Sequence, residues 1–172
     1  MKVVSSRYAD LPPDQRAYLE NIAEEQFGHI PLVRETTWAE PDWAYLGYQG
    51  EKLVVFHNVI LRSVSIDGAA TRIAGLNNMI TLPGCRGQGF ASRLLRETQP
   101  EWFDRHGAQR GMLLCADELV PFYARLGWRR VDVPVRYEQP SGALVWAASC
   151  MVLDAAEAAM PRQEVKLCGL PW

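Results

Sequence analysis

The sequence predicts a mixed α/β (α+β) domain in which a sheet is flanked by helices. In the first half, three strand-like runs follow one another and are separated by turn signals at Gln49-Gly50-Glu51 and Asp67-Gly68, a pattern typical of an antiparallel meander. The second half alternates short apolar runs with helical patterns, which predicts strand–helix–strand units. With 172 residues and 48% hydrophobic residues, the chain suits one domain over residues 1–172.

The first half of this domain is expected to begin with a strand over residues 2–8. Pro12-Pro13-Asp14 then opens a helix, in which apolar residues recur at helical spacing as far as Gly28. Residues 29–42 show no clear period, which predicts a loop or a short helix. The strands of the meander are predicted over residues 43–48, 52–66 and 71–82.

In the second half, a helix is expected from Phe90, with a kink at Pro100 and an end at Gly107. Residues 111–115 have the apolar character of a short buried strand. A further helix over residues 122–126 is stopped by Gly127. Two closing strands are predicted over residues 128–137 and 143–153.

Composition and charge exclude several classes of protein. The net charge of −2 and the lack of a basic run argue against a nucleic-acid partner. The sequence contains no run of 18 apolar residues that would predict a membrane span, and its first residues lack the apolar segment of a secretion signal. We therefore expect a cytoplasmic protein. The cysteines are widely spaced and have no nearby paired histidine, so neither a disulfide framework nor a metal site is expected.

A glycine-rich loop, Arg86-Gly87-Gln88-Gly89-Phe90-Ala91, joins the apolar run Met79–Leu82 to the following helix. Such a loop leaves backbone N–H groups unpaired at the positive end of the helix dipole, where phosphate binds. A mononucleotide P-loop is excluded because no lysine is near, and a dinucleotide loop fits poorly because its sixth position holds Ser92. A pyrophosphate held by Arg86 and the loop amides remains, beside the alternative that the glycines only allow close packing of strand and helix.

A second motif lies about thirty residues further on, at Tyr123, Gly127 and Trp128. Together with Arg86, Gly89 and Ala91 it resembles the GCN5-related N-acetyltransferases (GNAT), whose loop motif is Arg/Gln-x-x-Gly-x-Gly/Ala. The resemblance implies the GNAT acyl-CoA acyltransferase fold, with a mostly antiparallel sheet and a cleft between two splayed parallel strands, here residues 71–82 and 111–115. It also implies acetyl-CoA as the donor, held by Met79, Ile80, Thr81, Leu82, Arg86, Gly87, Gln88, Gly89, Phe90, Ala91 and Ser92.

Acyl transfer from a thioester to an amine needs a donor for the carbonyl oxygen and an acid for the departing sulfur. A backbone N–H around Met79 or Ile80 is expected to face the carbonyl oxygen. The resemblance implies Tyr123 as the general acid, since a phenol can protonate a thiolate. The alternative is a tyrosine ring that only packs beneath the cofactor.

The general base is the open question. Where many family members carry a glutamate before the loop, this chain has Asn77, and an amide takes up no proton but can position water or substrate. Asp117 and Glu118 are further candidates, unless they cap the next helix, and so is His57, whose ordinary pKa suits a base, unless it is a core residue. Cys115 has no paired histidine, so a buried thiol is favoured over an acyl-carrying nucleophile.

A closer resemblance, to the aminoglycoside 2'-N-acetyltransferases, bears on the acceptor. It rests on these residues: His57, Ile60, Arg62, Asp67-Gly68, Arg86-Gly87-Gln88, Ser92, Leu94, Leu95, Tyr123-Ala124, Gly127-Trp128, Glu164, Cys168 and Trp172. It implies that the C-terminal tail, residues 161–172, reaches the acceptor, and that the substrate-binding residues are His57, Asn78, Glu164 and Trp172. The alternatives are a core histidine at 57 and a hydrophobic tail tucked on the surface.

Two departures limit this closer resemblance: Asn77 replaces an acidic residue, and the tail after Cys168 is short and lacks acidic residues. The nodulation-type acyltransferases, which transfer a longer acyl chain to a sugar amine, are a looser match.

The predicted function is therefore acetyl-CoA-dependent transfer of an acetyl group to a primary amine of a small molecule, with aminosugars and aminoglycosides among the candidates. The alternatives are acetylation of a protein N-terminus or lysine, and a non-catalytic sensor that binds acyl-CoA or an amine. Neither nucleic acid nor a membrane is an expected partner, and a homodimer is left open.

Overall fold

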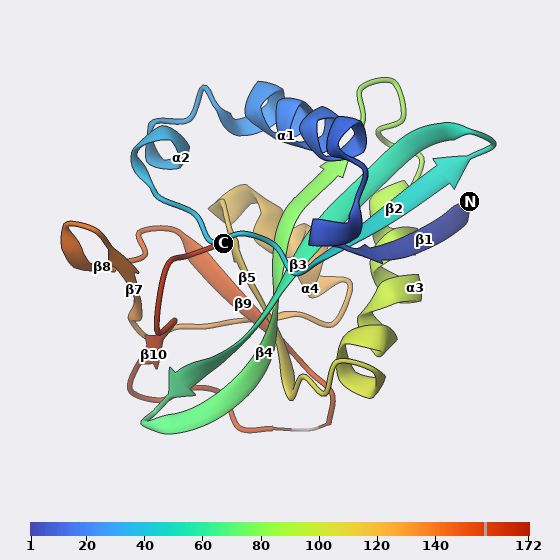
Figure 1. The fold of residues 1–172 in the computed structure, drawn as a ribbon. Helices are drawn as coiled ribbons and strands as arrows, with labels where there is room; N and C mark the ends of the chain where they lie inside the picture. Colours follow the sequence, from blue (N-terminus) through green and yellow to red (C-terminus); the bar gives the residue numbers. More distant parts are fainter. Residues whose placement is uncertain (157) are drawn as a thin grey trace.

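The two longest strands, β3 (Lys52–Ile66) and β4 (Ala69–Thr81), form an antiparallel hairpin at the centre of this computed structural model (Figure 1). The structure describes residues 1–156 and 158–172. Asp67 and Gly68 turn the hairpin with φ angles of 50° and 85°, the left-handed pair that a tight two-residue turn requires. The turn predicted at Asp67-Gly68 is confirmed.

Strands on both sides of the hairpin extend it into one sheet. Within the described residues the strand order is β6 (Arg129–Arg130), β9, β5, β4, β3, β10, β7 (Val135–Gln139) and β8 (Gly142–Val145). β2 (Trp43–Gln49) pairs with β3, and β1 (Lys2–Arg7) pairs with β2. β5 (Arg110–Cys115) runs parallel to β4 and pairs antiparallel with β9 (Ser149–Asp154). β10 (Val165–Lys166) pairs antiparallel with β3 and parallel with β7. The predicted mixed fold is confirmed, with β4 and β5 as the parallel pair at its centre.

The helices begin and end largely where the sequence predicts. α1 (Pro13–Phe27) has proline in its first turn and ends at Gly28, and the short α2 (Pro31–Glu35) lies in the irregular stretch. One 3₁₀ turn (Tyr8–Asp10) precedes α1, and another (Asp117–Leu119) precedes α4 (Val120–Ala124). The kink expected at Pro100 does not interrupt α3 (Phe90–Asp104). Because Pro100 is exposed, water can satisfy the carbonyl whose helical partner it removes.

The prediction of two long closing strands is wrong. Residues 128–137 divide into β6 (Arg129–Arg130) and β7 (Val135–Gln139), and residues 143–153 into β8 (Gly142–Val145) and β9. Pro134, between β6 and β7, has no N–H to donate to a strand ladder. β6 pairs with β9, whereas β7 pairs with β8 and β10, so the two halves of each predicted strand serve different parts of the sheet.

The central sheet has helix α3 on one face and α1 on the other. Tyr45 and Val59 pack with Trp102 of α3, while Phe56 packs with Leu19 of α1. Because side chains alternate along a strand, the even-numbered residues of β3 in this region face α1. Further along the same face, Ile60 packs with the C-terminal tail.

His57 lies in the core beneath α3. It is fully buried, its Nε2 is 2.9 Å from Thr98 Oγ1, and its ring stacks on Tyr45 and meets the edge of Trp102. Burial lowers the pKa of His57 from 6.5 to about 3. We therefore correct the expectation that His57 contacts the acceptor, because its ring is enclosed on the α3 face of the sheet and its Nε2 is already paired with Thr98.

The buried histidine predicts a specific loss of stability in acid. Since the pKa of His57 is depressed in the folded state, the unfolded chain binds the extra proton, and the stability is present above pH 6.5 and lost as the pH falls toward 3. We expect the difference in Tm between the wild type and His57→Gln to shrink when the pH is lowered from 7 to 4.5, as measured by circular dichroism. Carboxylates titrate in both proteins and cancel in the comparison. An equal difference in Tm at both pH values would contradict this assignment.

Candidate active site

The parallel strands β4 and β5 separate at the point where β4 is irregular. Their pairing ends at Leu76 and Leu113, although β4 continues to Thr81. Against β3, Asn77 pairs with Asn58 and Ile80 with Phe56, so β4 inserts one extra residue. Asn78, in this bulge, has a φ of 48°, a left-handed conformation that asparagine tolerates better than most residues.

Beyond the bulge, the outer edge of β4 has unpaired backbone groups. Leu82 N donates to Val54 O at 3.0 Å, and Ile80 is the next residue directed at β3. Because hydrogen-bonding direction alternates along a strand, the N–H groups of Met79 and Thr81 point away from β3, toward the side that β5 has left. Of the two amides expected to face the thioester carbonyl, Met79 therefore fits and Ile80 does not.

The glycine loop lies between this edge and helix α3. Gly84, Gly87 and Gly89 have φ angles of 75° to 77°, and within the described residues no atom lies within 4 Å of a Cβ built on any of them. Arg93 N donates to Gly89 O at 3.0 Å, the bond that closes the first turn of α3. The amides of Phe90, Ala91 and Ser92 precede that bond and have no partner within the helix. This open cradle at a helix N-terminus fits the pyrophosphate of acetyl-CoA.

Two side chains of the loop bond within the protein. Arg86 donates to Thr81 O at 3.3 Å and to Gln26 Oε1 of α1 at 2.5 Å. Gln88 Nε2 donates to Gly84 O at 3.2 Å and closes the loop. The arginine thus ties α1 to the end of β4, and its remaining N–H donors are left to bind a phosphate.

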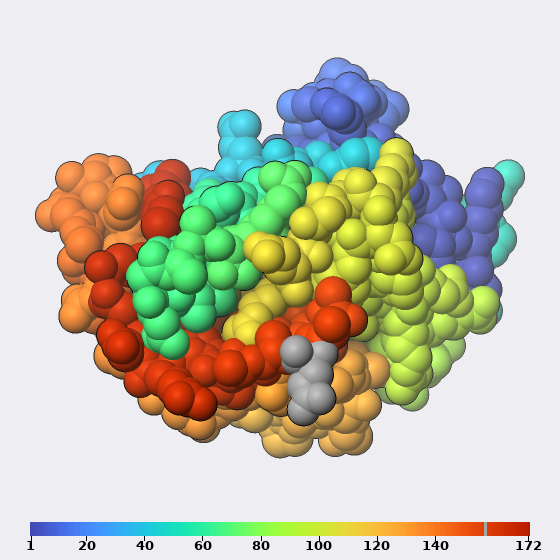
Figure 2. All heavy atoms as spheres, turned by 90° about the horizontal axis from the view of Figure 1, so that it is seen from below, coloured from blue at the N-terminus to red at the C-terminus, as the bar shows by residue number. Residues whose placement is uncertain are grey.

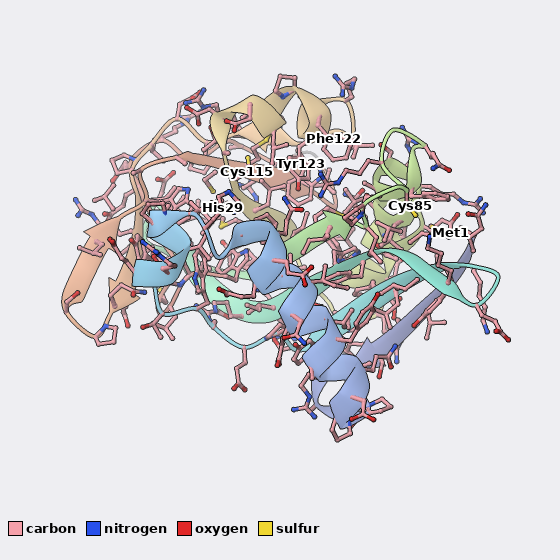
Figure 3. All side chains as sticks on the ribbon, turned by 90° about the horizontal axis from the view of Figure 1, so that it is seen from above. Met1, His29, Cys85, Cys115, Phe122 and Tyr123 are labelled. Atoms are coloured by element: carbon pink, nitrogen blue, oxygen red, sulfur yellow. The ribbon has the colours of Figure 1, made fainter. Side chains whose placement is uncertain are left out.

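Tyr123 stands at the end of β5, on α4. It packs edge-on against Phe122 and Trp128 and belongs to the same apolar cluster as Leu76 and Met79. Figure 3 shows Cys115, Phe122 and Tyr123 close together, with Cys85, just before the glycine loop, lying apart from them beside α3. Burial raises the pKa of Tyr123 above its usual value of 10, so the hydroxyl stays protonated and is available as a proton donor.

The candidate bases have other partners or lie in the open. Asp117 Oδ1 accepts a hydrogen bond from Ser149 Oγ at 2.6 Å, and the residue makes no capping bond. Glu118 is exposed in the same 3₁₀ turn. Burial raises the pKa of the Cys115 thiol to about 11, so it is not a ready nucleophile, in agreement with the interpretation as a buried thiol.

The C-terminal tail meets the site in part. The indole of Trp172 packs on Gly75, where a Cβ would lie 2.5 Å from the ring. Arg62 holds the tail in two ways: its Nη1 donates to Leu170 O at 2.7 Å, and its guanidinium carbon lies 5.5 Å from the centroid of the Trp172 ring. The ring of Trp172 therefore covers β4 at Gly75, two residues before Asn77. It is 3% exposed, so it packs as a core residue that borders the site, which is deeper than a tail tucked on the surface.

Glu164 is not brought to this site. Its carboxylate pairs with Lys166 Nζ at 2.8 Å and Arg136 Nε at 3.3 Å, and its backbone carbonyl accepts from Asp67 N in the hairpin turn. That turn precedes Ala69, which is about 26 Å from Asn77 along the strand at 3.3 Å per residue. Figure 2 shows the C-terminal segment packed beside the β3–β4 hairpin, on the face seen from below. We therefore correct the expectation that Glu164 binds the acceptor.

Asn58 is a site residue that the sequence did not reveal. It is 1% exposed and lies directly opposite Asn77, with its side-chain oxygen unpaired among the described residues. In the sequence, Asn58 is a single polar residue in the apolar run of β3, and nothing in that run marks it as a site residue. Only the strand register places it beside the bulge.

The family of the chain is shown by its sequence. A profile described as the acetyltransferase (GNAT) domain matches residues 16–131, which include the bulge, the glycine loop and Tyr123. The chain belongs to the GNAT family of acetyltransferases. Acetyl-CoA, expected from the sequence motifs, is the cosubstrate of this family. No curated protein sequence matches the chain.

Solved structures share the GNAT fold. ElaA of Escherichia coli has a TM-score of 0.61 at 14% identity, over 89% of this chain and 99% of its own. A putative N-acetyltransferase from Lactobacillus plantarum has a TM-score of 0.62 at 19% identity, over 90% of this chain and 98% of its own. A GNAT family acetyltransferase from Brucella melitensis, solved with acetyl-CoA, has a TM-score of 0.57 at 15% identity, over 95% and 94%. The closer likeness to aminoglycoside 2'-N-acetyltransferases is not shown by these matches.

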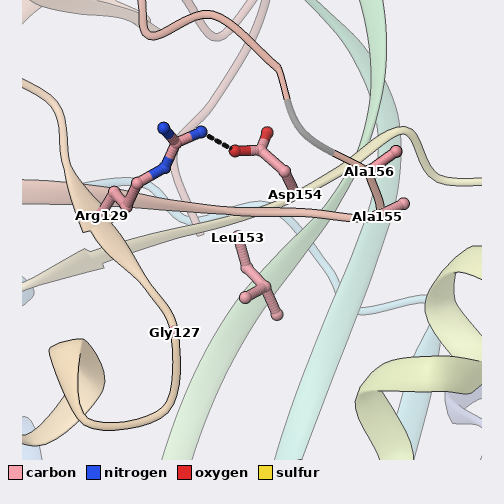
Figure 4. Close-up of a pocket in the computed structure, with 6 residues that line it drawn as sticks. All are labelled: Gly127, Arg129, Leu153, Asp154, Ala155 and Ala156. Atoms are coloured by element: carbon pink, nitrogen blue, oxygen red, sulfur yellow. Dashed lines mark hydrogen bonds and ion pairs between the residues drawn. The ribbon is translucent and has the colours of Figure 1, made fainter.

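Other features of the described residues lie outside this site. An open pocket of about 310 Å³ lies beyond α4, where Arg129 pairs with Asp154 beside Gly127 and Leu153 (Figure 4). No group of three or more acidic, histidine or cysteine side chains within residues 1–156 and 158–172 is arranged to hold a metal ion. In the same residues, no helix has the length and apolar character needed to span a membrane.

Two glycine variants test the cradle. Gly89 and Gly107 both have positive φ (77° and 65°) and open space at Cβ, but only Gly89 precedes α3 in the loop. Gly89→Glu and Gly107→Glu should therefore cost similar backbone strain, while only Gly89→Glu places a negative charge where the pyrophosphate binds. We expect saturating acetyl-CoA to raise the Tm of the wild type and of Gly107→Glu, and to leave that of Gly89→Glu unchanged in a thermal-shift assay. Equal stabilisation of both variants would remove the loop from the cofactor site.

Proposed function

We propose that this chain transfers the acetyl group of acetyl-CoA directly to a primary amine of a small molecule. The observation that carries the proposal is the bulge at Asn78, which opens β4 beside the glycine loop and Tyr123. A hydrogen-bond donor for a carbonyl, a cradle for a pyrophosphate and a proton donor for a sulfur thus lie around the end of one parallel strand pair. A cytoplasmic location belongs to the same proposal.

On the donor side, each group has a role that follows from its position. Acetyl-CoA, when bound, supplies an acetyl group activated as a thioester. The loop amides and Arg86 hold the pyrophosphate, and the outward edge of β4 from Met79 to Leu82 lies along the cofactor. The Met79 N–H donates to the carbonyl oxygen of the thioester, whose negative charge grows during attack.

Tyr123 donates to the sulfur atom of the thioester. Because burial raises its pKa, the phenol is a weaker acid than a free tyrosine, and its first action is a hydrogen bond donated to the departing sulfur. Full proton transfer follows only as negative charge builds up on that sulfur in the same buried surroundings. Tyr123 is therefore a proton donor that never loses its proton in the resting enzyme at neutral pH.

On the acceptor side, Asn77 and Asn78 face the transfer point and Trp172 borders it. Asn77 orients the amine or a water, while Asp117 or Glu118, on the turn after β5, takes up the proton released by the amine. An aminosugar suits this site, because its one amine is surrounded by hydroxyls that amide side chains can bind. Acetylation of a protein N-terminus or lysine, and amine or acyl-CoA sensing without turnover, are the alternatives that the assay below separates.

Tyr123→Phe tests the proposal in a CoA-release assay with glucosamine, ethanolamine, spermidine, kanamycin and a lysine-containing peptide as acceptors. We expect the wild type to use one of the small amines and not the peptide. The variant should lose about 10²-fold in kcat, because a positioned proton donor contributes on that scale, and keep its KM for acetyl-CoA. Tyr137→Phe is the control, because Tyr137 is an equally buried tyrosine on β7, and this variant should retain full activity.

Other results would point elsewhere. Preference for the peptide would favour the protein acetyltransferase. Binding of acetyl-CoA without CoA release from any acceptor would favour the sensor.

A further inference from the structure

The side-chain oxygen of Asn58 is buried without a partner. Within residues 1–156 and 158–172, no donor reaches Oδ1. Such atoms are few in native proteins, and each calls for an explanation, of which a bound water, a ligand and a catalytic role are examples. The other buried side-chain acceptor without a hydrogen bond there, Asp154 Oδ1, has Arg110 Nε at 2.8 Å in an ion pair. Asn58 has no such compensation.

The position of Asn58 places this oxygen beside the transfer point. Asn58 and Asn77 are directly opposite on β3 and β4, and residues so paired project to the same face of a sheet with Cα atoms about 5.5 Å apart. The bulge and Met79 follow within two residues of Asn77. The Asn58 oxygen is itself covered, so a small molecule that contacts Asn77 reaches it by displacing the side chains that lie over it.

A second unpaired atom lies on the same face. Nε1 of Trp172 is buried without an acceptor among the described residues, and its ring covers Gly75, the neighbour of Asn77 on this face. The two atoms differ in kind, since Asn58 Oδ1 accepts and Trp172 Nε1 donates. Together with the amide of Asn77 they form what we term the amide floor: Asn58, Asn77 and Trp172.

The charges around the amide floor are sparse. Around the floor, the residues on this face of β3 and β4 are Phe56, Asn58, Ile60, Arg62, Ile73, Gly75, Asn77 and Ile80. None is a carboxylate. The one charged group, Arg62, is positive, stacks on Trp172 and has the carboxylates of Asp42 and Glu138 near enough to act on its charge. A polycation would find no counter-charge on this floor, whereas one amino group can bind an amide oxygen.

We propose that Asn58 Oδ1 binds the amino group of the acceptor, and that the amide floor selects small amines with one positive charge and a neighbouring hydroxyl. This inference rests on the proposed function. Trp172 Nε1 donates to the hydroxyl, and the amide of Asn77 orients the nitrogen toward the acetyl group. Aminoglycosides, which carry several ammonium groups, are poor acceptors.

Asn58→Leu removes the amide at similar volume. We expect the KM of the best singly charged amine of the panel to rise about tenfold or more, as the loss of a hydrogen bond to a charged group would give, while the KM of acetyl-CoA stays within about twofold. The Tm should not fall, because an unpaired buried oxygen is removed. Gln99→Leu is the matched control: Gln99 Nε2 is also buried and unpaired, but it lies on α3, and the amine KM should stay unchanged.

Asn58→Asp tests the selection by charge. A carboxylate in the floor should raise kcat/KM for spermidine relative to the singly charged amine by about tenfold or more. An unchanged amine KM in Asn58→Leu, or an equal rise in Gln99→Leu, would overturn the role of Asn58. An unchanged ratio in Asn58→Asp would overturn the selection by charge.

Calorimetry separates this inference from the proposed function. The panel amines are titrated into the CoA-saturated wild type and the CoA-saturated Asn58→Leu variant. Binding that weakens in the variant supports the Asn58 contact even if no acceptor is acetylated, in which case only the proposed function fails. Equal binding to both proteins, or a water alone at Asn58 with no amine bound, overturns the inference.

Discussion

The extra residue that β4 inserts opposite His57 is the constraint on which the site depends. Without it, β4 could continue its pairing with β5 as far as Cys115, where β5 ends, and the backbone groups on that part of the edge would be bonded. With it, Asn78 takes a left-handed conformation, the strands separate beyond Leu76 and Leu113, and the Met79 amide is left without a strand partner. The bulge also keeps Asn77 and Ile80 on one face although they are three residues apart.

The core beneath the bulge holds this irregular geometry in place. His57, opposite the inserted residue, is fixed by Thr98 of α3 and by two aromatic rings. The same helix begins at the glycine loop, so one element supports the bulge at its middle and presents amides to the cofactor at its start. On the other face, α1 and the C-terminal tail pack on either side of Asn58 and leave its oxygen unpaired.

The sequence predicted what short-range patterns encode. The meander, the turn at Asp67-Gly68, α1, α3 and the loop before it follow from periodicity, proline and glycine positions, and the GNAT resemblance supplied the parallel pair. The pairing of the closing strands could not be predicted, because no short-range pattern indicates that β6 pairs with β9 while β7 pairs with β10. For the same reason Asn58 was missed and Glu164 misplaced: strand register and the path of the tail decide both, and both depend on distant residues.

Amide-resolved hydrogen exchange with and without acetyl-CoA tests the central claim most directly. If the bulge opens β4 to the cofactor, acetyl-CoA should slow exchange at Met79 and Thr81, and at residues 87–92, by about tenfold or more. Ile80 and Leu82, already directed at β3, should change little, as should Gly127 and Leu153 in the pocket beyond α4. Slowed exchange at that pocket with none at Met79 and Thr81 would contradict the account.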